Sequence, residues 1–143
     1  MSTTEYTGSC YCASIGFRYR TKVPPQDWSI RACQCRFCVA HDALSTSDPA
    51  GELDFAADID GDLQRFRFGL RTADFLLCRN CGVYIGAVID ADAGRLGIIN
   101  THALDTIPDN IAAVVPIGYD SEDTASRVER REQRWTPVAA VPW

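Results

Sequence analysis

The stretch Cys78-Arg79-Asn80-Cys81-Gly82 forms a C-x-x-C-G motif, and two further cysteine motifs precede it in the chain: Cys10-Tyr11-Cys12 and Cys33-Gln34-Cys35-Arg36-Phe37-Cys38. Together they contain all seven cysteines of the 143-residue chain. In extended chain, residues two apart face the same side, so a C-x-C can offer two sulfurs to one ion. A C-x-x-C turns tightly around a metal, and the glycine after it can take a positive φ as the chain leaves. The spacing therefore predicts metal-binding clusters.

The number of cysteines indicates how these clusters divide. Seven is odd, so complete disulfide pairing within one chain is impossible. Zinc takes four ligands in a structural site and keeps one position open in a catalytic site. We predict a closed zinc site at Cys10, Cys12, Cys78 and Cys81, and an open one at Cys33, Cys35 and Cys38. Two alternatives stay open: the cysteines are buried small apolar side chains, or only one zinc binds.

Composition narrows the class of protein. The length is that of one domain, and 46% hydrophobic and 23% charged residues are ordinary values for a globular chain. The net charge of -5 argues against a nucleic-acid binder and against docking on anionic membranes. Residues 1–6 carry no basic start and no apolar run, and the longest apolar stretches are too short to cross a bilayer. We therefore expect a cytoplasmic protein, where clustered cysteines usually bind metal or catalyse.

The apolar pattern predicts a mainly β fold. Short segments of strand character lie between turn signals, at residues 15–20, 64–68, 75–77, 83–89 and 95–99. We expect them to form antiparallel sheets. One helix is expected near the C-terminus, because Ser121-Glu122-Asp123 supplies a cap and arginines load the end of the segment that follows. This helix and the tail, about 120–143, would pack on a core of about 5–110 within a single domain, 1–143.

The three cysteine motifs taken together resemble the glutathione-dependent formaldehyde-activating enzymes, which are grouped with centromere protein V. The resemblance rests on residues 8–12, 33–38 and 75–82, with support from 100–105, and it covers about 5–110. It implies a β-tent fold and carbon-sulfur lyase chemistry, of which the type reaction joins glutathione and formaldehyde into S-hydroxymethylglutathione. It also implies that the four-cysteine set is structural and the three-cysteine set catalytic. The chain departs from the family at Ala13, usually glycine, and at Arg36, often serine.

Several residues near the motifs are candidates for catalysis or substrate binding. His41 follows the triplet and could transfer a proton, with an ordinary loop histidine as the alternative. Tyr84 and His102 are weaker candidates for the same role. A substrate of the glutathione type carries carboxylates, which could be bound by residues within the motifs. These are Arg36, Arg79 and Asn80, and the alternative is that they are solvated loop residues.

The sequence thus predicts a zinc-dependent carbon-sulfur lyase that acts on thiol-aldehyde adducts, such as a glutathione adduct. One alternative is a zinc-scaffolded binding module without catalysis, but such a module needs only the four-cysteine site. Another is a zinc hydrolase acting on a different small electrophile through an activated water. We expect no nucleic-acid or membrane partner. A homodimer could form through an edge strand.

Overall fold

The computed structural model describes residues 2–58 and 61–143, and it is mainly β, as predicted. The strands within the described residues are β1 (Thr4–Ser9), β2 (Ile15–Thr21), β3 (Ile30–Cys33), β4 (Ser45–Thr46), β5 (Glu52–Ala57), β6 (Leu63–Phe66), β7 (Asp74–Cys78), β8 (Tyr84–Ala91), β9 (Gly94–Asn100), β10 (Val114–Ile117) and β11 (Thr136–Ala140). The helices are α1 (Arg36–Ala40) and α2 (Thr124–Arg134), with 3₁₀ turns at Pro25–Asp27 and Thr101–Ala103. All five strand segments expected from the sequence are present, within three residues at their ends.

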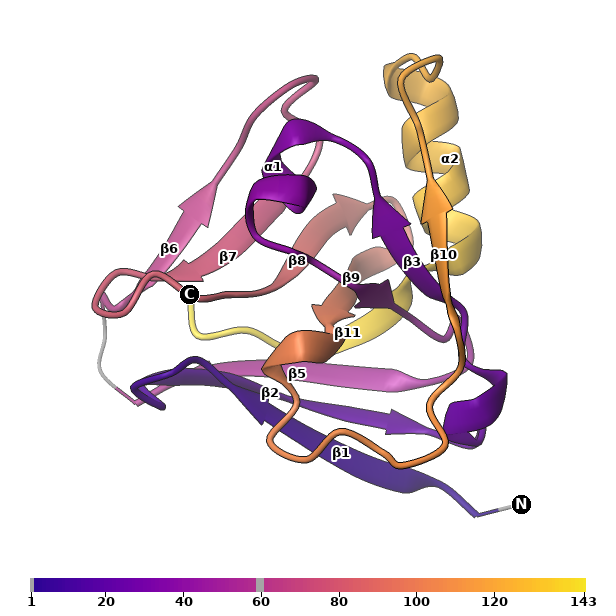
Figure 1. The fold of residues 1–143 in the computed structure, drawn as a ribbon. Helices are drawn as coiled ribbons and strands as arrows, with labels where there is room; N and C mark the ends of the chain where they lie inside the picture. Colours follow the sequence, from indigo (N-terminus) through magenta and orange to yellow (C-terminus); the bar gives the residue numbers. More distant parts are fainter. Residues whose placement is uncertain (1, 59–60) are drawn as a thin grey trace.

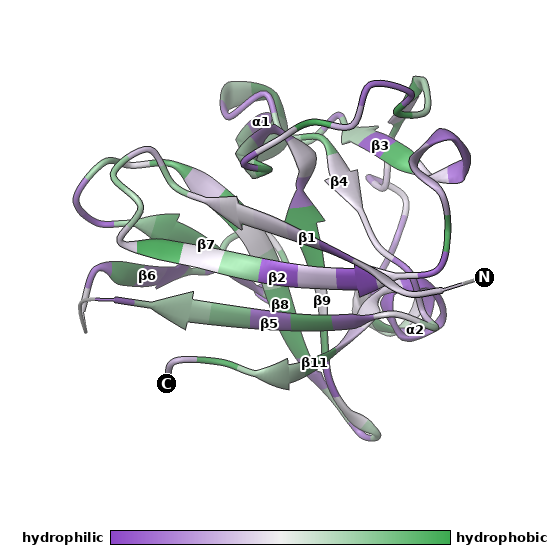
Figure 2. Cartoon of the chain, turned by 90° about the horizontal axis from the view of Figure 1, so that it is seen from below, coloured by the Kyte–Doolittle hydropathy of each residue, from purple (hydrophilic) through white to green (hydrophobic). Residues whose placement is uncertain are grey.

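The strands join into one open sheet in the order β1-β2-β5-β11-β9-β4-β3-β10, with β8, β7 and β6 branching from β9. Most neighbours run antiparallel, as expected, but β10 pairs with β3 and β11 pairs with β5 in parallel, so the sheet is mixed. Figure 1 shows β1, β2 and β5 as a lower layer beneath the β6–β9 layer. Strand β11 connects the two layers because it pairs with both β5 and β9; Figure 2 shows it beside β5.

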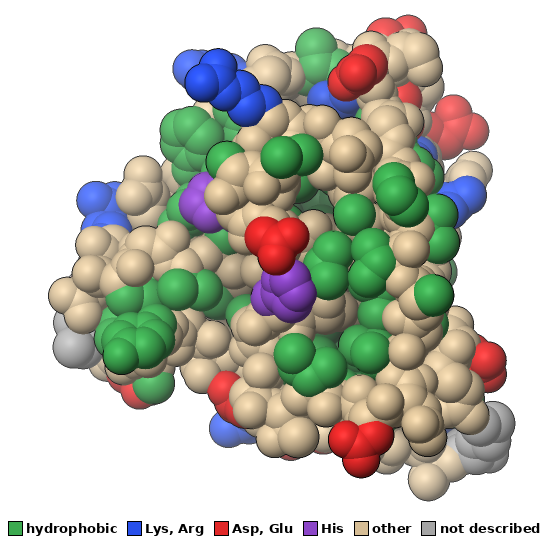
Figure 3. Space-filling view, in the orientation of Figure 1, with side chains coloured by type: hydrophobic (Ala, Val, Ile, Leu, Met, Phe, Trp, Pro, Cys, Tyr) green, Lys and Arg blue, Asp and Glu red, His purple; other side chains and the backbone are tan. Residues whose placement is uncertain are grey.

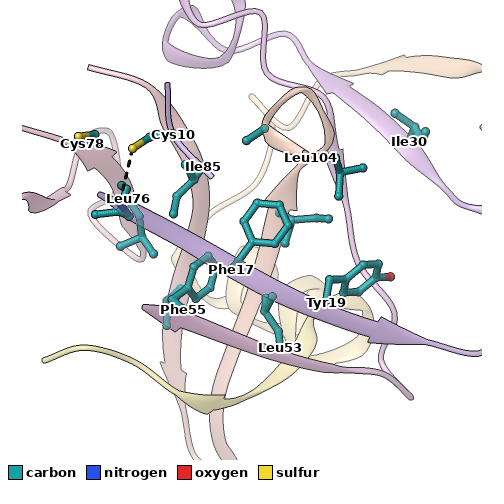
Figure 4. Close-up of a cluster of buried hydrophobic side chains, with 14 of the residues drawn as sticks. Cys10, Phe17, Tyr19, Ile30, Leu53, Phe55, Leu76, Cys78, Ile85 and Leu104 are labelled. Atoms are coloured by element: carbon teal, nitrogen blue, oxygen red, sulfur yellow. Dashed lines mark hydrogen bonds between the residues drawn. The ribbon is translucent and has the colours of Figure 1, made fainter. Parts of the chain in front are cut away.

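The main hydrophobic core fills the space between these layers. Inward-facing side chains of β2 and β5, including Phe17 and Phe55, pack against Leu76 of β7 and Ile85 of β8. Figure 4 shows Cys10 and Cys78 together at one end of this cluster. A second cluster joins β7 and β8 to the start of α1 and contains Cys38, Tyr84 and Trp135. Each core cluster therefore contains cysteines of one motif group, which fixes where the two groups lie.

The predicted C-terminal helix is confirmed as α2. Asp123 caps it by accepting a hydrogen bond from the backbone N–H of Ser126, and the Ser126 side chain accepts in return from the Asp123 backbone N–H. Figure 1 draws the helix behind β10, and arginines of the helix line one cavity together with Arg31 of β3. Trp135, directly after the helix, is buried. The helix contributes one side chain, Arg131, that is buried although charged. Within the described residues, no helix is long and apolar enough to cross a membrane.

Candidate metal centres

The four cysteines predicted to form the closed site converge in the structure. The Sγ atoms of Cys10, Cys12, Cys78 and Cys81 all lie within 4.8 Å of one another. The Sγ atom of Cys12 is 3.7 Å from that of Cys10 and 3.6 Å from that of Cys78. A tetrahedron with zinc–sulfur bonds of about 2.3 Å requires sulfur–sulfur distances of about 3.8 Å. The four sulfurs are therefore spaced as in a four-thiolate zinc site and offer the donor atoms that such a site needs.

Local turns bring these sulfurs together. After β1, the backbone N–H of Ala13 donates to the carbonyl of Cys10, and Ala13 takes a φ of 65°. At the end of β7, the backbone N–H of Cys81 donates to Sγ of Cys78 at 3.4 Å, and Gly82 has a φ of 83°. The glycine after the C-x-x-C thus takes the conformation expected of it. The site links β1 in the lower layer to β7 in the upper one.

Ser14 is a residue of this site that the sequence reasoning missed. Its hydroxyl lies 3.2 Å from Sγ of Cys78 and 3.3 Å from Sγ of Cys12. Hydrogen bonds from Ser14 and then from Asn80 lower the pKa of the Cys12 thiol to about 6. A ligand that is already thiolate at neutral pH favours metal binding, because cysteine coordinates as thiolate. No motif signals a supporting serine, since serine is common in turns.

The three cysteines of the triplet also converge, as a separate group. Cys33 ends β3, Cys35 is the N-cap of α1, and Cys38 lies in its first turn. Their Sγ atoms are within 4.8 Å of one another, and the backbone N–H of Cys38 donates to Sγ of Cys35 at 3.4 Å. The short helix folds the C-x-x-C half of the motif back toward Cys33. The group offers three sulfurs to one ion.

The thiols of the triplet differ in how readily they lose a proton. Hydrogen bonds from Cys33 and then Cys38 lower the pKa of Cys35 to about 2. The pKa of Cys38 is raised, by the hydrogen bonds with Cys33 and Cys35 and by burial. One thiolate therefore forms readily while its neighbour holds a proton. A cation between the sulfurs would allow all three to ionise, because a coordinated thiol loses its proton.

A cavity of about 90 Å³ lies beside the triplet. This cavity was not predicted from the sequence. All three cysteines line it, together with the aromatic side chains of Phe68, Phe75, Tyr119 and Trp135. Four arginines also line it: Arg31 from β3, and Arg127, Arg130 and Arg131 from α2. The sequence analysis treated these α2 arginines only as charges suited to a helix end. Their grouping depends on how α2 packs against β3, which the sequence pattern does not show.

The candidate residues named from the sequence lie elsewhere. Asn80, within the C-x-x-C of the four-cysteine site, and Arg79 beside it are both exposed. Arg36 is exposed at the start of α1. None of these three is among the described residues that line the cavity.

The candidate proton-transfer residues occupy three different environments. The ring centroids of His41 and Phe37 are 4.4 Å apart. His41 is not among the described residues that line the cavity. Nδ1 of His102 donates a hydrogen bond to the backbone carbonyl oxygen of Asp42, 2.8 Å away. Both histidines reach the surface on the same face (Figure 3). Tyr84 instead packs with Cys38 in the second core cluster and is fully buried.

The hydroxyl of Tyr84 has no hydrogen-bond partner within the described residues. Burial and then the charges of the three neighbouring cysteines raise the pKa of this phenol, so it keeps its proton. A buried hydroxyl without a partner costs free energy and calls for an explanation. It leaves a proton donor beside the triplet that no side chain of the described residues uses.

The fold and these clusters define a mainly β protein with two cysteine groups that can hold metal ions. No family model matches the chain, and no curated protein matches it. The chain is similar to a protein from Rhodobacter sphaeroides whose crystal structure is known. The two are 23% identical, the match covers 79% of this chain and 99% of the other, and the TM-score is 0.59. At this identity the likeness is one of fold.

Proposed function

We propose that this protein is a zinc-dependent carbon-sulfur lyase that acts on thiol-aldehyde adducts, related to the glutathione-dependent formaldehyde-activating enzymes. The observation that carries the proposal is the three-cysteine group, which lies on the wall of a cavity and is separate from a complete four-cysteine group. A site built only to hold the fold together takes four protein ligands, whereas a catalytic site leaves a position for the substrate. The second group has this open composition.

The reaction requires only a proton transfer besides the formation of one bond. In the adduct-forming direction the thiol sulfur bonds to the aldehyde carbon, and the thiol proton passes to the former carbonyl oxygen; cleavage is the reverse. When bound, zinc would supply a Lewis acid that stabilises a thiolate or polarises a carbonyl oxygen. Cys33, Cys35 and Cys38 would hold it. No oxidant or further reactant is needed.

The protein's own side chains would provide the rest of the environment. Tyr84 keeps a proton on Oη next to the triplet, so it is the donor best placed to hydrogen-bond the oxygen that gains the proton. Phe68, Phe75 and Trp135 line the cavity with apolar surface. An apolar wall excludes water and so strengthens the electrostatic contacts of the reacting group. His41 is the alternative proton carrier, and neither it nor Tyr84 is among the described residues that line the cavity.

The test compares Cys35→Ser with the unchanged protein. Serine is a good helix N-cap, so the substitution removes a thiolate ligand while keeping the cap of α1. We expect zinc, counted by native mass spectrometry, to fall from two to one per chain. We expect S-hydroxymethylglutathione exchange, followed by NMR with glutathione and formaldehyde, to fall by at least about a thousandfold, since the open metal site is lost.

The matched control is Val39→Ser, an exposed position on the same short helix that contacts neither group of sulfurs. It should keep two zinc ions and full exchange. Unchanged exchange in Cys35→Ser would remove the lyase proposal. Two zinc ions in the wild-type protein without exchange, but with hydrolysis of a small ester or thioester, would favour a zinc hydrolase. One zinc and no turnover would leave a zinc-scaffolded binding module.

A further inference from the structure

The cavity beside the triplet is positively charged, although the chain carries a net charge of -5. Four arginines line it, and Asp120 is the one acidic residue among the described lining residues. Glu122 pairs with two of the arginines, at 3.2 Å from Nε of Arg127 and 2.7 Å from Nε of Arg130. Arg130 also stacks on the Tyr119 ring at 3.5 Å. These two arginines are therefore already held in place and partly neutralised.

The other two arginines are different, because they are buried and have no acidic partner. Arg31 is 8% exposed and donates only to neutral oxygens, those of Ser29 and Ser47. Arg131 is 7% exposed and donates from Nη1 to Oγ1 of Thr72 at 2.6 Å. No carboxylate among the described residues lies within ion-pair distance of either guanidinium. Burying an unpaired charge is costly, so such a pair is rare unless a ligand supplies the counter-charge.

Arg131 has a buried donor atom without a partner among the described residues. Its Nε has no hydrogen-bond partner among the described residues, although the atom is buried. The guanidinium packs on the Trp135 ring at 4.8 Å, which fixes its plane. A held guanidinium with free N–H groups matches the two oxygens of a carboxylate, and such paired hydrogen bonds are strong.

We propose that Arg31 and Arg131 form a carboxylate-binding subsite, and that the ligand of the cavity is a short acid whose carboxylate is close to its thiol or carbonyl group. The cysteines and both arginines line one cavity, so a single small acid that enters it meets both the sulfurs and the guanidinium groups. That the ligand is a substrate rests on the proposed lyase function. The subsite itself does not, because it depends on the arginines alone.

Measurements of affinity can distinguish this subsite from simple charge balance. Arginines near a three-thiolate metal site can offset its negative charge, and in that case neither a free ligand nor its carboxylate would matter. Charge balance would make the arginines important for metal affinity. A carboxylate subsite would make them important for the choice between acids and neutral analogues. The two outcomes can be measured separately.

The first experiment reads out the unchanged protein, uses a variant only to assign one resonance, and needs no catalysis. In the zinc-loaded protein, the Nε–H resonance of Arg131 is followed by ¹H–¹⁵N NMR during titration with acetate, and with acetamide as the neutral counterpart. The resonance is assigned as the one missing from Arg131→Lys. We expect acetate to shift it with saturation and acetamide to leave it in place. Equal responses to both, or no response to either, would overturn the subsite.

The second experiment measures selectivity between two thiols of the same length. With cobalt in place of zinc, the visible spectrum reports thioglycolate and 2-mercaptoethanol reaching the open position. We expect the wild-type protein to bind thioglycolate at least about tenfold more tightly, the scale of one charge-assisted hydrogen bond. Arg131→Met should remove this preference without changing the affinity for 2-mercaptoethanol. Arg95→Gln, an exposed arginine at the β8–β9 turn, makes the same change in net charge and should preserve the preference.

Each failure has its own meaning. Loss of metal affinity in Arg131→Met, with equal affinity for the two thiols in the wild-type protein, would replace the subsite by charge balance. Competition by inorganic phosphate but not by acetate would assign the arginines to a phosphate instead and overturn the carboxylate. Carboxylate preference in a protein without lyase turnover would keep the subsite and discard the lyase. Lyase turnover without a preference for carboxylates would support the lyase and overturn the subsite.

Discussion

The two cysteine groups differ in their surroundings more than in their chemistry. The four-cysteine group joins β1 to β7 at the end of the main core, and a serine hydroxyl supports its sulfurs. The three-cysteine group is held within one short segment, residues 33–38, and faces a cavity with arginines and aromatic rings. The four-cysteine group connects distant parts of the chain, while the three-cysteine group lies within a single short segment. From this comparison we propose that the number of ligands and the distance they span together set the role of each group, structural for the first and reactive for the second.

The largest effect is expected when the four-cysteine group is broken. Cys78→Ser removes a buried sulfur that lies next to Cys12 and Ser14, and with it the connection between the two layers. Structural zinc contributes on the order of 10 kcal/mol to folding in small zinc proteins, which equals the whole stability of an ordinary domain. We expect no folded protein, as judged by far-UV circular dichroism and by loss of dispersion in the NMR spectrum.

The matched variant is Cys35→Ser, which breaks the other group. It should remain folded, with a melting temperature within several degrees of the wild-type value, because the segment it belongs to is local and its cap is kept. If both variants unfolded, the three-cysteine group would also be structural. If both folded, the long connection through Cys78 would not be needed, and the contrast between the groups would fail.

Stepwise removal of metal should sharpen the same contrast. An open site has one protein ligand fewer, so it should release its ion at a lower concentration of a chelator such as EDTA. We expect native mass spectrometry to show a population with one zinc per chain that keeps the circular dichroism spectrum of the native protein. The second ion should leave only as that spectrum is lost. Release of both ions together, in one unfolding transition, would contradict the assignment of separate roles.

Tyr84→Phe tests whether turnover at the three-cysteine group depends on a single buried hydroxyl. The hydroxyl has no partner among the described residues, so removing it should leave the free energy of unfolding unchanged or raise it by about 1 kcal/mol. Turnover of the adduct should fall by about tenfold to a hundredfold, because a positioned proton donor is lost. Urea unfolding and the NMR exchange assay measure the two quantities. A stable variant with full turnover would return His41 to consideration as the proton carrier.

The division of the cysteines could be predicted from the sequence because ligand spacing is a local property. Residues two or three apart in a turn lie close together whatever the rest of the fold does, so the grouping of Cys33, Cys35 and Cys38 could be predicted. The mainly β fold and α2 followed from periodicity and from the Asp123 cap for the same reason. Strands without a clear period, such as β4 with two residues, were missed.

The cavity could not be predicted because it depends on contacts between distant segments. Arg31 and Arg131 are a hundred positions apart, and each is unremarkable in its own segment: one lies in a strand, and the other in a basic helix end. Only the packing of α2 beside β3 shows that both are buried at one site. The residues chosen from the sequence, Arg36 and Arg79, were chosen for nearness in the chain to the ligands, and both side chains are exposed.

The smallest expected effect concerns the turn at the four-cysteine group. Ala13 takes a φ of 65°, a left-handed conformation that costs a residue with a Cβ about 1–2 kcal/mol. The family that the cysteine motifs resemble usually has glycine at this place, so we expect Ala13→Gly to relieve strain in the C-x-C turn. Glycine gains freedom in the unfolded chain, which offsets part of this, and we expect a net gain of up to about 1 kcal/mol. Urea unfolding of the zinc-loaded protein measures it, and unchanged turnover is expected because the turn lies at the four-cysteine group and not at the triplet. A loss of stability would mean that the methyl group of Ala13 has packing value that outweighs its backbone strain.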